Sequence, residues 1–228
     1  MSLCQKIHKK LMKLRLQPIR VFCIHHVSDV FDATTMWECD WMYTDDFKAK
    51  VAAIQKEYMF ISLSEACDKL KHDTIRCKKY AVLTADDGWA SMKNILPWLK
   101  EQNIPITLFI NPLYLDGVHK QERETEQLLT EEDIEDIILK YQNVMIASHG
   151  WGHVDTTKLN VKEFLDNVEQ AENVLTQLPS KIPFYAFTYG RYKNEFIDIL
   201  HEHHLVPVLI DGKMNVKYDG AIHRENLN

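Results

Sequence analysis

The stretch Val82-Leu83-Thr84-Ala85-Asp86-Asp87-Gly88 carries an apolar strand straight into two adjacent carboxylates and a glycine. Similar apolar runs rich in β-branched residues recur along the chain, and segments of helical period separate them. This alternation is typical of an α/β protein, in which βα units surround a parallel sheet buried on both faces. The pattern is compatible with an open doubly wound sheet and with a closed barrel, and periodicity does not choose between them.

Strands and helices are expected to alternate over most of the chain. The predicted strands are 20–27, 80–85, 105–110, 143–148, 184–189 and 205–210. The predicted helices are 45–57, 63–71, 91–102, 131–141, 161–178 and 193–203. Three helix starts place a capping residue three positions before an acid: Ser62 with Glu65, Thr130 with Asp133, and Asn160 with Glu163.

The composition is that of an ordinary globular protein, because 46% of the 228 residues are hydrophobic and 26% are charged. This length favours one domain, and no low-complexity tract divides the chain. No apolar run reaches the roughly 18 residues of a spanning helix. The net charge of −6 argues against a general nucleic-acid binder, which needs clustered cations.

The charge is unevenly placed, since residues 1–20 carry +6 and the remaining chain carries −12. Ile7, Leu11 and Leu14 fall on one stripe of a helix that lysines flank. We therefore expect a basic N-terminal helix at 1–18 ahead of a domain at 19–228. Such a helix is suited to peripheral contact with an anionic membrane, although packing on the domain with its cations in water is the simpler explanation.

The cysteines and the N-terminal segment predict a cytoplasmic protein. Five cysteines, none of them in a C-x-x-C pair, are typical of reduced thiols. Lys13 and Arg15 interrupt the only stretch that resembles a secretory signal.

A second chemical signal is Ser148-His149-Gly150-Trp151-Gly152-His153, which follows another apolar strand. Its glycines disfavour a helix, so a loop folding around one ion explains the histidine spacing better. Taken alone, each signal has a plain explanation: an Asx-type turn for the carboxylates, and exposed or core histidines. Together, one carboxylate and two imidazoles form a catalytic ligand set with open positions for water and substrate.

A metal ion in this set lowers the pKa of bound water toward about 7 and polarises a carbonyl, and amide hydrolysis requires both effects. Asp87, His149 and His153 are the predicted ligands, and the spare carboxylate of Asp86 is the natural base. Zinc is the default ion, with cobalt, nickel and iron as alternatives.

Thr84 to Gly88 resembles the T-F-D-D-G motif of polysaccharide deacetylases, the NodB-homology group of carbohydrate esterase family 4, and His149 to His153 resembles its H-S-x-x-H motif. In that family the first Asp is the base, and the second binds the metal with both histidines. The resemblance assigns these roles to Asp86, Asp87, His149 and His153. It implies a distorted (β/α)7 barrel with parallel strands, and a hydrolase that removes acetyl groups from N-acetylated amino sugars.

Further matches extend the resemblance from residue 20 to about 226. Phe22 to Ser28 is similar to the family's opening M-Y-H-x-V-S strand, and Ile61 to Ala66 matches the usual lead-in to the next helix. Ala186 to Tyr192 resembles the stretch A-Y-P-Y-G-x-Y. The resemblance implies that the backbone N–H of Tyr189 helps to bind the oxyanion.

The chain departs from the family at four positions of interest. Ala85 replaces Phe and Gly150 replaces Ser, which changes packing and hydrogen bonds around the site. Thr188 stands where Pro precedes the tyrosine, which loosens that backbone. Ala186 stands where one branch has an Arg that pairs with the base. Arg224 resembles the Arg that ends the other branch, and we expect it to be the replacement.

The family's protonating histidine has no clear counterpart here. His25, His204 and His223 are the candidates. His204 stands where related chains turn with Gly, so a left-handed position at a helix end explains it better. His25 ends a predicted strand and aligns with a recurrent family histidine, so it is the first choice for the protonating residue. The alternative is a structural role in the core.

Two other functions are compatible with the sequence. One is a non-haem Fe(II) oxygenase, whose iron also binds two histidines and one carboxylate. The other is a carbohydrate-binding module that has lost catalysis. The oxygenase leaves Asp86 without a task. A cytoplasmic deacetylase does not meet finished extracellular polymer, so the expected partner is an N-acetylated sugar or a nucleotide-linked or lipid-linked glycan precursor. The sugar itself, and the choice between N-acetyl and O-acetyl groups, stay open.

Overall fold

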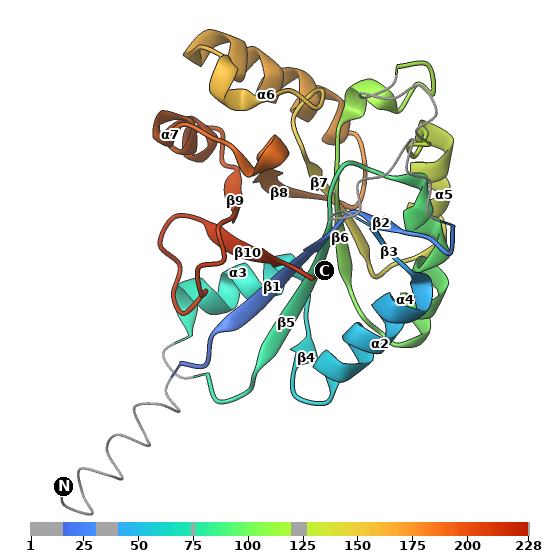
Figure 1. Cartoon of the computed structure of the whole chain (residues 1–228). Helices are drawn as coiled ribbons and strands as arrows, with labels where there is room; N and C mark the ends of the chain where they lie inside the picture. The colour runs from blue at the N-terminus through green and yellow to red at the C-terminus, as the bar shows by residue number, and fades with distance from the viewer. Residues whose placement is uncertain (1–15, 31–40, 74–75, 120–126, 228) are drawn as a thin grey trace, which may run out of the picture.

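Parallel strands close into a barrel in the computed structural model, which describes residues 16–30, 41–73, 76–119 and 127–227 (Figure 1). Seven of the described strands form the ring: β1 (Ile19–Ile24), β5 (Tyr80–Ala85), β6 (Ile106–Ile110), β7 (Val144–Ser148), β8 (Lys181–Ala186), β9 (Val206–Ile210) and β10 (Ile222–Asn226). The ring closes because β1 pairs with both β10 and β5. The barrel predicted from the family resemblance is therefore confirmed, and an open sheet is excluded.

Helices and short strands surround this ring. The described helices are α2 (Thr44–Gln55), α3 (Leu63–His72), α4 (Leu96–Glu101), α5 (Glu131–Lys140), α6 (Val161–Leu175) and α7 (Asn194–Glu202). The 3-10 turns are η1 (Ala90–Asn94), η2 (Pro112–Tyr114), η3 (Thr156–Lys158) and η4 (Thr188–Gly190). Strands β2 (His26–Val27) and β3 (Trp41–Met42) pair with each other, and β4 (Met59–Phe60) pairs with β5. All three predicted caps are confirmed by side-chain hydrogen bonds at Ser62, Thr130 and Asn160.

Several segments differ from the sequence prediction, among them the strand expected at 20–27, which is divided at His25 into β1 and β2. The helix expected at 91–102 is divided into η1 and α4, because Pro97 lies in the first turn of α4 and favours a new helix start there. The strand expected at 184–189 ends at Ala186, ahead of a turn in which Tyr189 has a φ of 56°. Strand β10 was not predicted, because its sequence Ile-His-Arg-Glu-Asn has one apolar residue and lacks the usual pattern of a buried strand.

The expected helix at residues 1–18 lies mostly outside the described residues. The structure covers only its last three positions, and these are not helical, because Leu16 forms a β-bridge with Arg76. Pro18 accounts for this difference, since a proline disfavours helical backbone in the residue before it. Among the described residues, no helix has the length and apolar character needed to cross a bilayer.

Candidate active site

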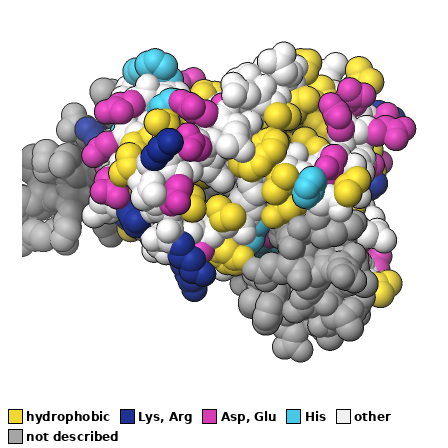
Figure 2. All heavy atoms as spheres, turned by 90° about the horizontal axis from the view of Figure 1, so that it is seen from above, with side chains coloured by type: hydrophobic (Ala, Val, Ile, Leu, Met, Phe, Trp, Pro, Cys, Tyr) yellow, Lys and Arg dark blue, Asp and Glu magenta, His cyan; other side chains and the backbone are white. Residues whose placement is uncertain are grey.

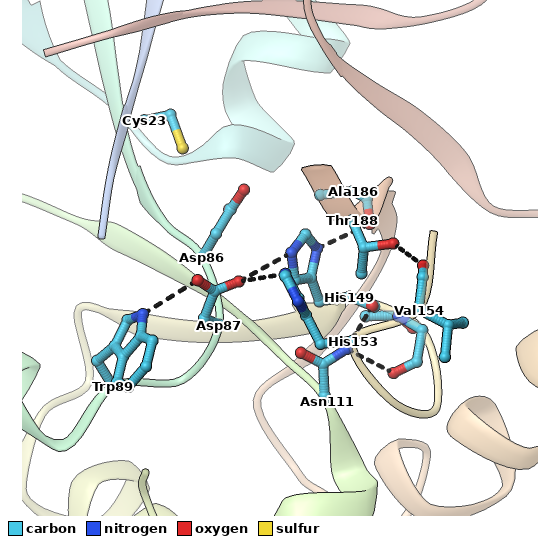
Figure 3. Close-up of polar contacts among 12 residues, drawn as sticks. Cys23, Asp86, Asp87, Trp89, Asn111, His149, His153, Val154, Ala186 and Thr188 are labelled. Atoms are coloured by element: carbon cyan, nitrogen blue, oxygen red, sulfur yellow. Dashed lines mark hydrogen bonds and ion pairs between the residues drawn. The ribbon is translucent and has the colours of Figure 1, made fainter. Parts of the chain in front are cut away.

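Polar side chains follow three of the barrel strands, β5, β7 and β8, at the point where each strand ends, and Figure 3 shows those of Asp86, Asp87 and His149. Asp86 and Asp87 follow β5, His149 follows β7, and Tyr189 lies in the turn after β8. In a parallel barrel the carboxyl ends of all strands meet at the same end, so these residues lie close together although they are distant in sequence. Figure 2 views the molecule from above Figure 1 and shows hydrophobic side chains gathered near the middle of that face, with histidine and acidic side chains among them.

The three predicted ligands converge on one point. Asp87 Oδ1 lies 3.1 Å from His149 Nε2 and 3.1 Å from His153 Nε2. Their ligand atoms all lie within 4.8 Å of one another. Burial raises the pKa of Asp87, but hydrogen bonds from the two imidazoles bring it well below its usual range, so this carboxyl group is ionised.

The cluster of Asp87, His149 and His153 suits a divalent cation, as the hydrogen bond of His149 Nδ1 indicates. His149 Nδ1 lies 2.9 Å from the carbonyl oxygen of Ala186, which can only accept, so Nδ1 carries a proton. A protonated Nε2 donates to the Asp87 carboxylate, whereas in the neutral ring that would bind a cation Nε2 offers a lone pair in place of that proton. A carboxylate oxygen and two imidazole nitrogens are the donors that zinc binds, and a cation between them removes the repulsion.

Arg224 lies beside Asp86 and forms a bidentate ion pair with it. Arg224 Nη1 and Nη2 donate to Asp86 Oδ1 at 2.6 Å and to Oδ2 at 2.8 Å, and Nη1 also donates to Thr84 Oγ1 at 3.1 Å. The Arg224 side chain is 1% exposed. Burial raises the pKa of Asp86, but the guanidinium charge brings it below the ordinary value, so the carboxylate is ionised and able to accept a proton.

Removal of the Arg224 charge is expected to destabilise the protein. In Arg224→Met the Asp86 carboxylate stays buried without its partner, and breaking such a pair costs about 3–5 kcal/mol. The measurement is urea unfolding of the purified variant. Arg20→Met is the matched control, because Arg20 also binds a carboxylate, that of Glu225, with both side chains about 40% exposed. An exposed pair contributes about 0–1 kcal/mol, so equal losses in the two variants would contradict the buried-pair assignment.

The structure places His25 close to Asp86, while His204 and His223 lie elsewhere. A ring nitrogen of His25, the sulfur of Cys23 and a carboxylate oxygen of Asp86 lie within 4.8 Å of one another. His204 follows α7 with a φ of 58°, the left-handed position that the sequence predicted. The His223 ring is buried between two carboxylates outside the site, at 2.9 Å from Asp211 and 3.0 Å from Asp219.

Tyr189 lies next to the third predicted ligand. Its ring centroid is 4.4 Å from that of His153, and its side chain is 45% exposed. The φ of 56° places Tyr189 in the left-handed region, which a bulky residue rarely adopts. Strained backbone of this kind is concentrated at functional sites.

The sequence analysis missed two residues that orient the ligands. Asn111 Nδ2 donates to the carbonyl oxygens of His149 at 2.5 Å and of Gly150 at 3.2 Å. Asn111 is the polar residue directly after β6, so the signal that identified the other site residues was present here too. Trp89 Nε1 donates to Asp87 Oδ2 at 3.0 Å; the position of this aromatic residue near a strand end suggested a contact with a sugar ring, and nothing in the sequence indicated the bond to Asp87.

The glycine that replaces the family's serine has a geometric reason. Gly150 has a φ of 80°, and a Cβ atom there would lie 2.7 Å from Asn167 Oδ1 and 2.9 Å from the Tyr185 hydroxyl oxygen. A side chain at this position would force both neighbours to move. The loop that carries the two histidines is therefore built around a residue without a side chain.

Comparisons with known proteins agree with this geometry. A sequence profile of the polysaccharide deacetylase family matches residues 74–208. A search of curated proteins finds no significant match. Among solved structures, IcaB from Ammonifex degensii is 18% identical with a TM-score of 0.77, over 94% of this chain and 93% of that chain. The Streptococcus pyogenes deacetylase PplD in complex with acetate is 16% identical with a TM-score of 0.77, over 92% of each chain. A de-N-acetylase from Aggregatibacter actinomycetemcomitans is 17% identical with a TM-score of 0.73, over 92% of this chain and 94% of that chain.

Proposed function

Because this chain belongs to the polysaccharide deacetylase family, whose members are hydrolases that act on carbon–nitrogen bonds, we propose that it removes acetyl groups from N-acetylated amino sugars of a glycan or its precursor. One observation carries the proposal. The ionised Asp86 carboxylate, oriented by Arg224, lies directly beside the cluster formed by Asp87, His149 and His153. A base next to a metal-ligand set is what the hydrolysis of an amide requires.

Asp87, His149 and His153 are the residues that would hold the divalent ion. An ion held there supplies Lewis acidity, which makes a nearby water more acidic and draws electron density from a carbonyl oxygen. The mixed oxygen and nitrogen donors fit zinc, with cobalt, nickel or iron as alternatives.

Four other residues have proposed roles in the chemistry. Asp86 accepts the proton of the attacking water, and Arg224 keeps that carboxylate ionised and oriented. The Tyr189 backbone N–H donates to the oxygen of the acetyl group as negative charge develops on it. His25, close to Asp86, gives a proton to the sugar nitrogen as the carbon–nitrogen bond breaks. The products are acetate and the free amino sugar.

The test is acetate release from a panel of N-acetylated and O-acetylated sugars, including nucleotide-linked ones, with and without a chelator. We expect release from at least one N-acetyl substrate, loss of it with chelator, and recovery when zinc is added back. Tight sugar binding without acetate release would instead support a binding module. Turnover that depends on oxygen and bound iron would support an oxygenase.

We further propose that the protein works in the cytoplasm on a nucleotide-linked or lipid-linked precursor, and that residues 1–18 assist by contact with an anionic membrane. The support is sequence alone: six cations and no acid in residues 1–20. Each lysine near an anionic surface adds about 1 kcal/mol of attraction, and salt screens it.

This membrane contact predicts salt-sensitive co-sedimentation with vesicles that contain anionic lipid. A variant with Lys6, Lys9, Lys10 and Lys13 changed to Gln should sediment much less at low salt. Neutral vesicles serve as the control. Equal sedimentation of the wild-type protein and the variant would contradict the proposed membrane contact. A soluble nucleotide sugar would then be the better substrate class.

A further inference from the structure

Two loops carry the third metal ligand and the oxyanion donor of the proposed site. The metal loop, residues 149–155, contains His153, and the tyrosine turn, residues 188–191, contains Tyr189. Glycines at positions 150 and 152 give the metal loop backbone freedom, so contacts from outside must define its shape. One such contact is the His153 backbone N–H, which donates to the Tyr114 hydroxyl at 3.1 Å.

Two buried threonine hydroxyls join the metal loop and the residue after it to the tyrosine turn. The Thr188 hydroxyl donates to the carbonyl oxygen of Val154, the residue after His153 (Figure 3). The Thr156 hydroxyl donates in the opposite direction, to the carbonyl oxygen of Arg191 at 2.5 Å. Both threonines are 1% exposed. We call this pair of hydrogen bonds the threonine clasp.

The clasp encloses the strained residue of the tyrosine turn. Thr188 precedes Tyr189, and Arg191 follows it by two residues. A left-handed conformation in a residue other than glycine costs about 1–2 kcal/mol, so surrounding contacts must maintain the φ of 56° at Tyr189. The family motif has a proline before this tyrosine, which stiffens the turn but has no hydroxyl to donate. Thr188 restrains the same turn through a bond that also reaches the metal loop.

We propose that Thr188 is a positioning residue, which aligns His153 with the other ligands and the Tyr189 N–H with the substrate through a single hydrogen bond. The inference rests on the proposed function, because it assigns Thr188 to the same site. The rings of His153 and Tyr189, whose centroids are 4.4 Å apart, and the ion pair of Arg191 with Asp155 at 3.0 Å are further contacts between the two loops. Displacement of either loop therefore disturbs both the metal ligand and the oxyanion donor.

The test compares Thr188→Val, which keeps the branched shape but removes the donor, with Thr188→Ser, which keeps the hydroxyl. Zinc affinity is measured by competition with a chelator on the folded protein. Loss of a contact that orients a ligand typically weakens metal affinity about 10–100-fold, so the Val variant should bind zinc at least about tenfold more weakly. The Ser variant should stay near wild type. In cobalt-loaded protein, the visible absorption bands should change in the Val variant alone.

Thr176→Val is the matched control, because the Thr176 hydroxyl also donates to a backbone carbonyl, that of Glu172 at 2.6 Å, at the end of α6. Its zinc affinity should equal that of wild type. If Thr188→Val fails to fold, Thr156→Val breaks the other half of the clasp and should weaken zinc binding in the same direction.

A Thr188→Val protein with lowered stability in its metal-free form but unchanged zinc affinity and cobalt spectrum would overturn the proposal. The hydroxyl would then have a purely structural role. Zinc affinity does not depend on knowing the sugar, so the two proposals fail separately. If the wild-type protein binds zinc but releases no acetate, the proposed deacetylase activity is refuted. The role of Thr188 is still decided by the zinc affinity of the Thr188→Val variant.

Discussion

Asp86→Asn is expected to lower acetate release about 10²–10⁴-fold while one zinc ion per chain stays bound. General-base catalysis contributes about this factor, and an amide cannot accept the proton of the attacking water. The metal should stay because its predicted ligands are Asp87, His149 and His153, none of which changes. Metal content and turnover are measured on the same preparation, and activity is expressed per folded, zinc-loaded molecule because the Asn leaves Arg224 without its charged partner.

Asp136→Asn is the control for this loss. Asp136 pairs with Lys140 at 2.5 Å on the exposed surface of α5, so the same chemical change there should leave turnover unchanged. If the Asp86 variant turned over at close to the wild-type rate, Asp86 would not be the general base. The oxygenase and the binding module would then become the stronger interpretations.

His149→Ala is expected to abolish stoichiometric zinc binding, and activity with it. The variant keeps two of the three predicted ligands, and it also loses the bond from His149 Nδ1 to Ala186 that fixes the orientation of the ring. Since loss of an orienting partner alone costs about 10–100-fold in affinity, loss of a ligand should weaken binding by more than about 100-fold. His153→Ala should behave in the same way.

The measurement is metal content after dialysis against a weak chelator, followed by a zinc titration. His72→Ala is the control, because His72 is exposed on α3 and its ring contacts a backbone carbonyl of the same helix at 3.0 Å. It should retain one zinc ion per chain. Full metal content in His149→Ala would show that the ligand set is wrong.

Much of the fold was predictable because its determinants lie close together in sequence. The strand at Tyr80–Ala85 matches its predicted bounds, and the caps at Thr130 and Asn160 form as the local pattern indicates. Strand β10 was not predictable in this way, because its backbone is held by pairing with β9 and β1 rather than by an apolar pattern of its own. Without β10 the ring would not close.

The residue types of the site could be predicted from short stretches of sequence, because a polar residue directly after an apolar strand is recognisable within a few positions. Asp86, Asp87 and His149 were identified from such strand ends, and Arg224 from its resemblance to a family residue. Only the folded barrel decided that Arg224 meets Asp86, 138 positions earlier in the chain. That contact depends on how neighbouring strands align around the ring, which periodicity does not encode. The threonine clasp has the same origin, since Thr188 reaches Val154 across 34 positions only when β7 and β8 lie side by side and the loops after them approach each other.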